Sequence, residues 1–277
     1  MSFTLPQILC PDEALGASGA GVRVAILDSG LDLAHPMMKG VRRQLKSCST
    51  FVRGRHEDWP EPCDPFGHGT PVTWIVNQTA PGAELHFVRV LSDEGTSDPA
   101  IFQAALDWAI HQDFQVVNLS LGLEQEITDY WRARFLELAD SAYFRDVILV
   151  AAASNSYDWI VPASFSAVIS VNSDYFPDPL AFTPRDREKL LYGPKPQIWL
   201  DAPGDMVKAP RAGTKSHFYY IGTSFAAPRV TGVVARILER YPGLKPFEVK
   251  TLLYRLGLYY RQSLPRRQAS GDSGPGS

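Results

Sequence analysis

Cysteine is scarce in this chain. Only Cys10, Cys48 and Cys63 occur among 277 residues, and an odd number of thiols cannot all pair within one molecule. None of the three stands in the C-x-x-C spacing typical of metal or redox sites. We therefore expect a protein of the reducing cytoplasm, without a disulfide framework and without a cysteine-bound metal.

Long apolar runs and an excess of one charge are also missing. No stretch approaches the ~20 consecutive apolar residues that span a bilayer, and residues 1–10 lack the basic and then apolar pattern of a signal peptide. The formal net charge of -3 gives no electrostatic footprint for nucleic acid or an anionic membrane. Neither partner is expected. The motifs H-E-x-x-H and G-x-S-x-G are absent too, which excludes the commonest classes of zinc protease and lipase.

What the sequence does contain is an alternation of short apolar runs with segments of helical periodicity. The expected buried strands are residues 22–27, 85–91, 115–119, 147–152, 167–171 and 197–200. The expected helices are residues 70–77, 98–111, 127–143, 222–240 and 246–256, with Asp98 as an N-cap before Pro99 and with Pro228 tolerated in a first turn. This order predicts an α/β fold of three layers, α/β/α, with a parallel sheet between two helical layers.

No stretch inside the chain resembles a linker, so one large domain is expected. We place it at residues 20–260, after an N-terminal extension of residues 1–19. A tail of residues 261–277, rich in glycine, serine and proline, is expected to be disordered.

Asp28 follows the first apolar run, in the segment Leu27-Asp28-Ser29-Gly30. The carboxyl ends of strands in open parallel sheets are where ligands bind, so Asp28 is a candidate catalytic carboxylate. An aspartate before Ser-Gly is also typical of an ordinary turn, and on this segment alone the two interpretations are about equally good.

His68 and Ser224 begin two of the expected helices. His68 lies between Gly67 and Gly69, which permit close approach of the backbone, and a helix N-terminus disfavours the imidazolium form, so a neutral base is expected. Ser224, in Gly222-Thr223-Ser224-Phe225-Ala226-Ala227-Pro228, has small neighbours and helix N–H groups beside its hydroxyl. Alone, it could equally be a plain N-cap serine.

Taken in order, Asp-Ser-Gly, His-Gly-Thr and Gly-Thr-Ser-Phe-Ala-Ala-Pro resemble the signature of the subtilisin-like serine proteases, the subtilases. Two further segments are similar to that family: Asn118-Leu119-Ser120-Leu121-Gly122, and Ala151-Ala152-Ala153-Ser154-Asn155. The resemblance covers about residues 20–256. It implies a serine endopeptidase with the fold predicted above.

The resemblance also implies residue roles. Ser224 would attack the scissile carbonyl, His68 would accept its proton, and Asp28 would fix the imidazole tautomer. Asn155 would donate its side-chain amide to the oxyanion, beside the backbone N–H of Ser224. Extended substrate would pair with Ser120, Leu121 and Gly122 and with Gly95, Thr96 and Ser97 on the opposite side. The pocket walls, Ala153 and Ser154 among them, are expected within residues 151–154 and 156–161.

Three departures from the family pattern stand out. Ser154 and Ser156 occupy positions where glycine is common, so the pocket rim is expected to be narrower or of different polarity. The segment between His68 and residue 85 lacks the long loop that supplies a calcium site in many subtilases, and no metal and no cofactor are expected. No long segment precedes the core, which suggests an intracellular processing protease without a pro-domain.

Three hypotheses of function remain open. The leading one is an active endopeptidase. Its expected partner is a peptide or protein substrate, and the enzyme itself is expected to be a monomer. The first alternative is a subtilase-like module that binds peptides with little turnover. The second is a peptide ligase or esterase, because an acyl-enzyme can also pass its acyl group to amines. Asp93, Glu94, Asp98 and Asp158 hint at basic substrates, although solvated loop carboxylates are the simpler interpretation.

Overall fold

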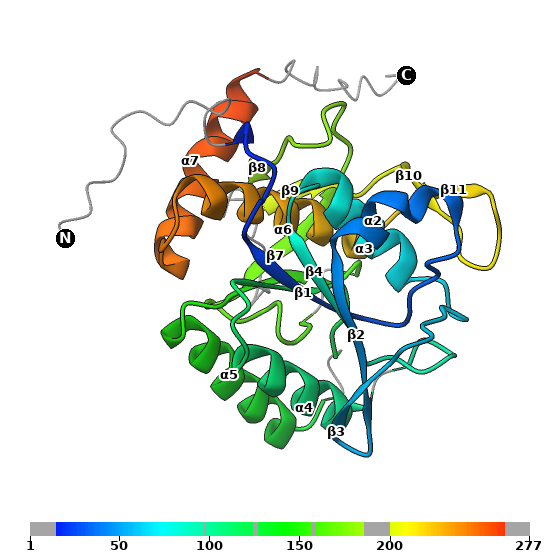
Figure 1. Ribbon diagram of the computed structural model, residues 1–277. Coiled ribbons are helices and arrows are strands. Elements are labelled where there is room, and N and C mark those ends of the chain that lie inside the picture. Colours follow the sequence, from blue (N-terminus) through cyan, green and yellow to red (C-terminus); the bar gives the residue numbers. More distant parts are fainter. Residues whose placement is uncertain (1–14, 97, 124–126, 157–158, 186–199, 264–277) are drawn as a thin grey trace, which may run out of the picture.

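The computed structural model describes residues 15–96, 98–123, 127–156, 159–185 and 200–263. Within them the central element is a nine-stranded sheet of order β3-β2-β4-β1-β5-β6-β7-β9-β8. Its seven inner strands are parallel, and only the edge strands β3 and β8 run antiparallel to their neighbours. Helices lie on both sides of the sheet (Figure 1), so the three-layer α/β/α prediction is confirmed.

Most inner strands coincide with the apolar runs of the sequence. They are β1 (Arg23–Asp28), β4 (Glu84–Arg89), β5 (Val116–Leu119), β6 (Ile148–Ala152), β7 (Ile169–Asp174) and β9 (Leu200–Pro203). Successive residues of β1 face opposite cores: Val24 and Ile26 pack on one side, Ala25 and Leu27 on the other. Because both faces are covered, such strands carry continuous apolar runs and not an alternating pattern.

The helices divide between the two faces. The first core contains side chains of α2 (Lys39–Gln44), α3 (Gly69–Thr79), α6 (Thr223–Arg240) and α7 (Pro246–Ser263). The second contains side chains of α4 (Pro99–Ile110) and α5 (Asp129–Phe144). The predicted cap of α4 is confirmed, since Asp98 accepts a hydrogen bond from Ala100 N at 2.8 Å.

Several short elements were not predicted from the sequence: η1 (Pro36–Met38), α2, β2 (Leu45–Val52), β3 (Arg55–Asp58), β8 (Thr183–Pro184), β10 (Val207–Pro210) and β11 (His217–Tyr220). β2 and β3 form a hairpin whose turn residues, Arg53 and Gly54, both have positive φ. This is the geometry of a tight two-residue hairpin turn. Gly54, which lies between two segments rich in polar residues, was the available signal.

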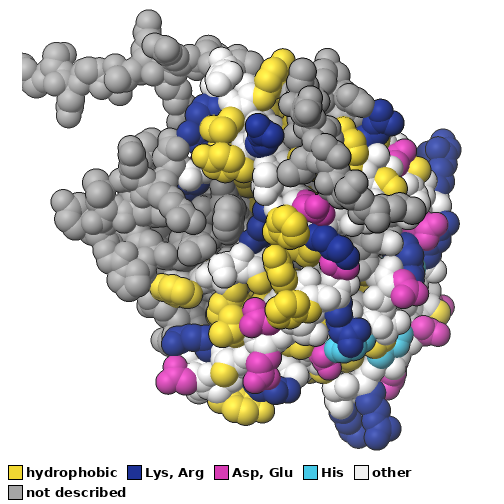
Figure 2. All heavy atoms as spheres, turned by 90° about the vertical axis from the view of Figure 1, so that its left-hand side faces the viewer, with side chains coloured by type: hydrophobic (Ala, Val, Ile, Leu, Met, Phe, Trp, Pro, Cys, Tyr) yellow, Lys and Arg dark blue, Asp and Glu magenta, His cyan; other side chains and the backbone are white. Residues whose placement is uncertain are grey.

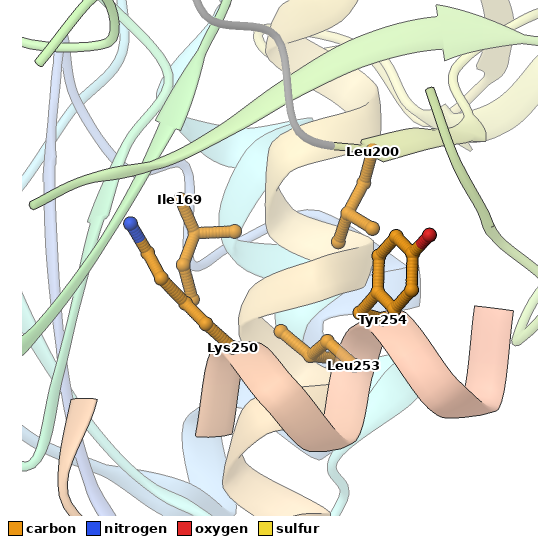
Figure 3. Close-up of a pocket in the computed structure, with 5 residues that line it drawn as sticks. All are labelled: Ile169, Leu200, Lys250, Leu253 and Tyr254. Carbon is orange, nitrogen blue, oxygen red and sulfur yellow. The ribbon is translucent and has the colours of Figure 1, made fainter. Parts of the chain in front are cut away.

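The carboxyl-terminal helix α7 packs against the last strands of the sheet. Figure 3 shows Leu253 and Tyr254 of α7 facing Ile169 of β7 and Leu200 of β9. α7 continues to Ser263, past the expected end at residue 256 and past residue 261, where the disordered tail was expected to start. Residues 264–277, and 197–199 of one predicted strand, lie outside the described residues.

Charge is mixed on the described surface. On the face in Figure 2, cationic and anionic side chains are interspersed among apolar ones. No described helix is both long and apolar enough to cross a membrane.

Candidate active site

Asp28 and His68 meet at the carboxyl end of β1. Asp28 is the last residue of β1 and is fully buried, while His68 is the N-cap residue of α3. His68 Nδ1 donates to Asp28 Oδ1 at 2.8 Å, and Ser29 N donates to the same oxygen at 2.7 Å. Because Nδ1 carries the proton shared with Asp28, Nε2 is the imidazole nitrogen that remains to act as a base.

The two turns that carry these residues pack backbone to backbone. A Cβ added to Gly69 would lie 2.3 Å from Gly30 O, and one added to Gly30 would lie 2.2 Å from Cys63 O. Neither position tolerates a side chain, because contacts that short do not occur between real Cβ atoms and their neighbours. The two glycines therefore set the close approach that allows Asp28 and His68 to meet.

A second carboxylate, Asp64, joins the same turns. Its Oδ1 accepts from Ser29 Oγ at 2.8 Å and from Gly67 N at 2.9 Å, and its Oδ2 accepts from Thr70 N at 2.9 Å. Ser29 Oγ in turn accepts from Gly69 N at 3.0 Å. Asp64 thus links the turn after Asp28 to residues just before and just after His68 at the start of α3.

The electrostatic setting of His68 differs from the sequence expectation. A helix N-terminus was expected to favour the neutral ring. Burial does lower the pKa of His68, but the Asp28 carboxylate, through its charge and hydrogen bond, and Asp64, through its charge, outweigh burial and leave the pKa above its ordinary value. The imidazolium form, which arises when His68 has taken a proton, is therefore stabilised.

Ser224 lies in the first turn of α6, directly after Gly222, the N-cap, and Thr223. The ring of Phe225, the next residue, lies 5.4 Å from the His68 ring between centroids. The start of α6 is thus adjacent to the His68 ring. Ser224 Oγ donates to Ser120 O at 3.0 Å, so the hydroxyl must turn from that carbonyl to His68 for proton transfer. Such rearrangement between the free and substrate-bound states is common in enzymes.

The position of Pro228 was predicted wrongly. It is the sixth residue of α6 and therefore lies beyond the first turn. Since proline has no N–H, the carbonyl four residues earlier, that of Ser224, receives no helical hydrogen bond from it. Ser120 Oγ donates to this carbonyl instead, at 2.8 Å.

Asn155 follows β6 and lies beside the start of α6. Its Oδ1 accepts from Thr223 N at 3.1 Å, which leaves the Nδ2 amide group as a donor. A Cβ added to Gly222 would lie 3.4 Å from Asn155 Oδ1. The amide is therefore held next to the residues that precede Ser224, where an oxyanion donor is required.

The expected substrate-binding residues fall into two groups. The first group follows the ends of two strands: Ser120, Leu121 and Gly122 come directly after β5, and Ala153 and Ser154 come directly after β6. Gly95 and Thr96 belong to a tight loop in which Ser92 N donates to Thr96 O at 2.9 Å. Ser97 lies outside the described residues.

Thr231, like Asp64, escaped the sequence analysis, and the contacts of Asn118 were not anticipated there. Thr231 of α6 donates to Asn118 Oδ1 at 2.8 Å, and Asn118 Nδ2 donates to Ser120 Oγ at 3.0 Å. With the bond from Ser120 Oγ to Ser224 O, these contacts form a buried chain from α6 through β5 and back to the start of α6. The only signal in the sequence was a polar Asn118 within an otherwise apolar strand.

The acidic side chains near the Gly95 loop are mostly engaged elsewhere. Asp93 pairs with Arg89 at 2.5 Å, and Asp98 caps α4. Asp158 lies outside the described residues. The structure therefore gives the suggested preference for basic substrates little support. No group of three or more potential metal ligands was found among the described residues, and the expected absence of a metal stays a prediction.

Known proteins are similar to this chain in sequence and in fold. The sequence profile of the subtilase family matches residues 19–257. Subtilisin DY of Bacillus licheniformis is 29% identical over 257 residues, which cover 87% of this chain and 85% of the relative. The thermostable alkaline protease of Halalkalibacterium halodurans is also 29% identical over 257 residues, but the match covers only 64% of its length. Among solved structures, sphericase aligns with a TM-score of 0.71 at 22% identity, covering 86% of this chain and 84% of sphericase.

The family profile and the similar proteases thus identify a subtilisin-like serine endopeptidase, a hydrolase that acts on peptides or proteins. The chain belongs to the subtilase family.

Proposed function

We propose that the enzyme cleaves peptide bonds through an acyl-enzyme formed on Ser224. Ser224 Oγ attacks the scissile carbonyl while His68 Nε2 takes its proton, and His68 then delivers that proton to the leaving amine. Asp28 holds the ring in the tautomer that leaves Nε2 free. The observation that carries this proposal is the 2.8 Å contact between His68 Nδ1 and the buried Asp28 carboxylate, beside the start of the helix that bears Ser224.

The oxyanion is proposed to be held by two donors, Asn155 Nδ2 and Ser224 N. The contact between Asn155 Oδ1 and Thr223 N supports this role, because it orients the amide and leaves its N–H groups for a ligand. A preorganised donor costs no reorganisation when negative charge develops, which is why such donors accelerate the reaction.

Substrate is proposed to bind as an extended strand along Ser120, Leu121 and Gly122, with Gly95, Thr96 and Ser97 on its other side. Hydrogen bonds to the main chain give affinity for any sequence, so selectivity is left to the side-chain pockets. Ala153 and Ser154 are proposed to form part of one pocket wall.

The enzyme is further proposed to work in the cytoplasm, as a monomeric processing protease. Two described cysteines support a reducing compartment: Cys48 and Cys63 are both free thiols. Burial raises the pKa of Cys48 to about 12, so that thiol stays protonated and unreactive. Cell fractionation with an antibody to the protein tests the location, and recovery in a secreted fraction would contradict it.

Peptide cleavage tests the proposed reaction. Purified enzyme is incubated with a peptide library derived from a proteome, and the new termini are identified by mass spectrometry. Hydrolysis should give new amino and carboxyl termini with wild type and none with Ser224→Ala. Joined peptides would indicate a ligase, and bound but intact peptides with both proteins would indicate a binding module.

A further inference from the structure

The geometry beyond β5 and β6 determines which side chain can precede the scissile bond. The two strands pair in parallel up to Leu119 and Ala151. Beyond that point the chains follow different partners: Ser120 bonds to Ser224 in both directions, while Ala153 N donates to Val171 O at 2.9 Å. If peptides bind as proposed above, with Ser120, Leu121 and Gly122 along the substrate and with Ala153 and Ser154 in a pocket wall, the side chain before the scissile carbonyl enters between these two segments.

Ile160 lies beside the first of these two segments, against Gly122. A Cβ added to Gly122 would lie 2.5 Å from Ile160 Cγ1 and 2.7 Å from its Cδ1. The side chain of Ile160 therefore rests directly on the backbone of Gly122. Ile160 is 9% exposed and belongs to the same apolar cluster as Leu121 and Ala151.

The backbone of Ile160 and of the next residue, Val161, is held in place. Leu123 and Val161 exchange two hydrogen bonds, each of 2.9 Å between N and O. Ile160 N donates to Ser164 Oγ at 3.1 Å, and Ser164 N donates to Ile160 O at 2.9 Å. Because the main chain is bonded at Ile160 and at Val161, the β-branched side chain of Ile160 has little freedom to move aside for a substrate.

We propose that Ile160 fills the pocket for the residue before the scissile bond and restricts cleavage to bonds that follow glycine, alanine or serine. This inference rests on the proposed endopeptidase function and adds the substrate class. Protein interiors are close-packed, so a substrate side chain larger than that of serine would overlap with the Ile160 side chain, which lies against Gly122. A difference of one methylene in such a pocket changes the specificity constant roughly 10- to 200-fold.

Peptides that differ only in the residue before one scissile bond test the inference. With glycine, alanine, leucine, phenylalanine and arginine at that position, wild type should cleave the alanine peptide with a kcat/KM at least about 10-fold above that of the phenylalanine peptide. Ile160→Ala and Ile160→Gly should raise the phenylalanine-to-alanine ratio of kcat/KM by a factor of the same order. Ile160→Leu should leave that ratio low.

Ile101→Ala is the matched control, because Ile101 packs against the same core from α4 and does not face Gly122. Its selectivity should equal that of wild type. Each rate is divided by the concentration of active sites, titrated with a small fluorophosphonate that has no side chain to fit the pocket, so a partly unfolded variant is still scored correctly.

The titration also separates the two claims. Wild type that reacts with the fluorophosphonate at Ser224 but cleaves after leucine or phenylalanine as fast as after alanine would overturn the role of Ile160 alone. Wild type that does not react at all would overturn the proposed function. Unchanged selectivity in folded, titratable Ile160→Gly would also overturn the inference.

Discussion

Ser120 and Ser224 are joined by two reciprocal hydrogen bonds: the hydroxyl of each donates to the main-chain carbonyl of the other, at 2.8 and 3.0 Å. One of the two carbonyls is available because Pro228, four residues after Ser224, supplies no helical N–H. The break in the hydrogen-bond ladder of α6 is thereby used to attach the nucleophile helix to the strand proposed to bind substrate.

Removing the Ser120 hydroxyl should destabilise the protein in a way that depends on Pro228. Ser120→Ala leaves the partly buried Ser224 carbonyl without its Ser120 donor, at a cost of roughly 1–3 kcal/mol in free energy of unfolding. In the Pro228→Ala background the N–H of residue 228 can bond to that carbonyl, so the cost should be smaller. Denaturant unfolding of the four proteins of this double-mutant cycle, all carrying Ser224→Ala to prevent self-digestion, measures the difference. Equal costs in both backgrounds would show that the carbonyl is not the shared partner.

Asn155 should contribute to kcat and hardly to KM. In subtilisin, loss of the corresponding donor costs about 10²- to 10³-fold in kcat, and a loss of that order is expected for Asn155→Ala. Asn155→Asp is the sharper variant, since it keeps an acceptor for Thr223 N but removes the donor and adds negative charge. Steady-state kinetics on one peptide measures both. A kcat that is nearly unchanged in Asn155→Asp would remove Asn155 from the oxyanion site.

The rate should depend on pH through a His68 whose pKa is raised. Because His68 must be neutral to accept the serine proton, kcat/KM should rise with pH around a midpoint above 6.5, the ordinary histidine value. The folded state also binds this proton more tightly than the unfolded chain. That stabilising contribution is complete below the unfolded pKa and is lost as pH rises through the folded pKa.

Asp64 should take part in this shift, because its charge raises the pKa of His68. Asp64→Asn should move the midpoint of kcat/KM to lower pH. It should also destabilise the protein locally, because the Asp64 carboxylate accepts hydrogen bonds from Ser29, Gly67 and Thr70. Asp113→Asn, which removes one negative charge from a side chain that is 98% exposed, is the charge-matched control and should leave the midpoint in place. A midpoint that rises, or does not move, in Asp64→Asn would contradict the electrostatic account.

Sequence patterns located Asp28, His68 and Ser224 because each stands within two residues of a glycine and at the start or end of an apolar or periodic segment. Asn155 was found only through family resemblance, since nothing around it marks an amide donor. Asp64 and Thr231 could not be found at all. Their significance comes from partners that are distant in the chain, such as Ser29 for Asp64 and Asn118 for Thr231, and local periodicity carries no information about such contacts. The β2–β3 hairpin was missed for a different reason, because β3 is exposed and β2 only partly buried, so neither carries the apolar runs that marked the buried strands.

Lys250 should be unusually reactive for a lysine. Burial lowers its pKa to about 8, and Figure 3 shows its amine directed away from Leu253 and Tyr254. Since the folded state releases this proton more readily than the unfolded chain, stability should increase between about pH 8 and the ordinary lysine pKa. Competitive acetylation read by mass spectrometry should give a labelling midpoint near pH 8 for Lys250 in the folded protein and a higher midpoint for the same residue in the unfolded protein. Identical midpoints for Lys250 in the two states would contradict this.

The central claim is that Ser224 is a nucleophile activated by His68 and Asp28. Reaction with a fluorophosphonate, followed by intact-mass measurement and peptide mapping, tests it most directly. The account predicts one adduct per molecule on the Ser224 hydroxyl, no adduct in Ser224→Ala, and reaction slowed by orders of magnitude in His68→Ala. An adduct on another residue, or labelling of Ser224 at the same rate without His68, would contradict it.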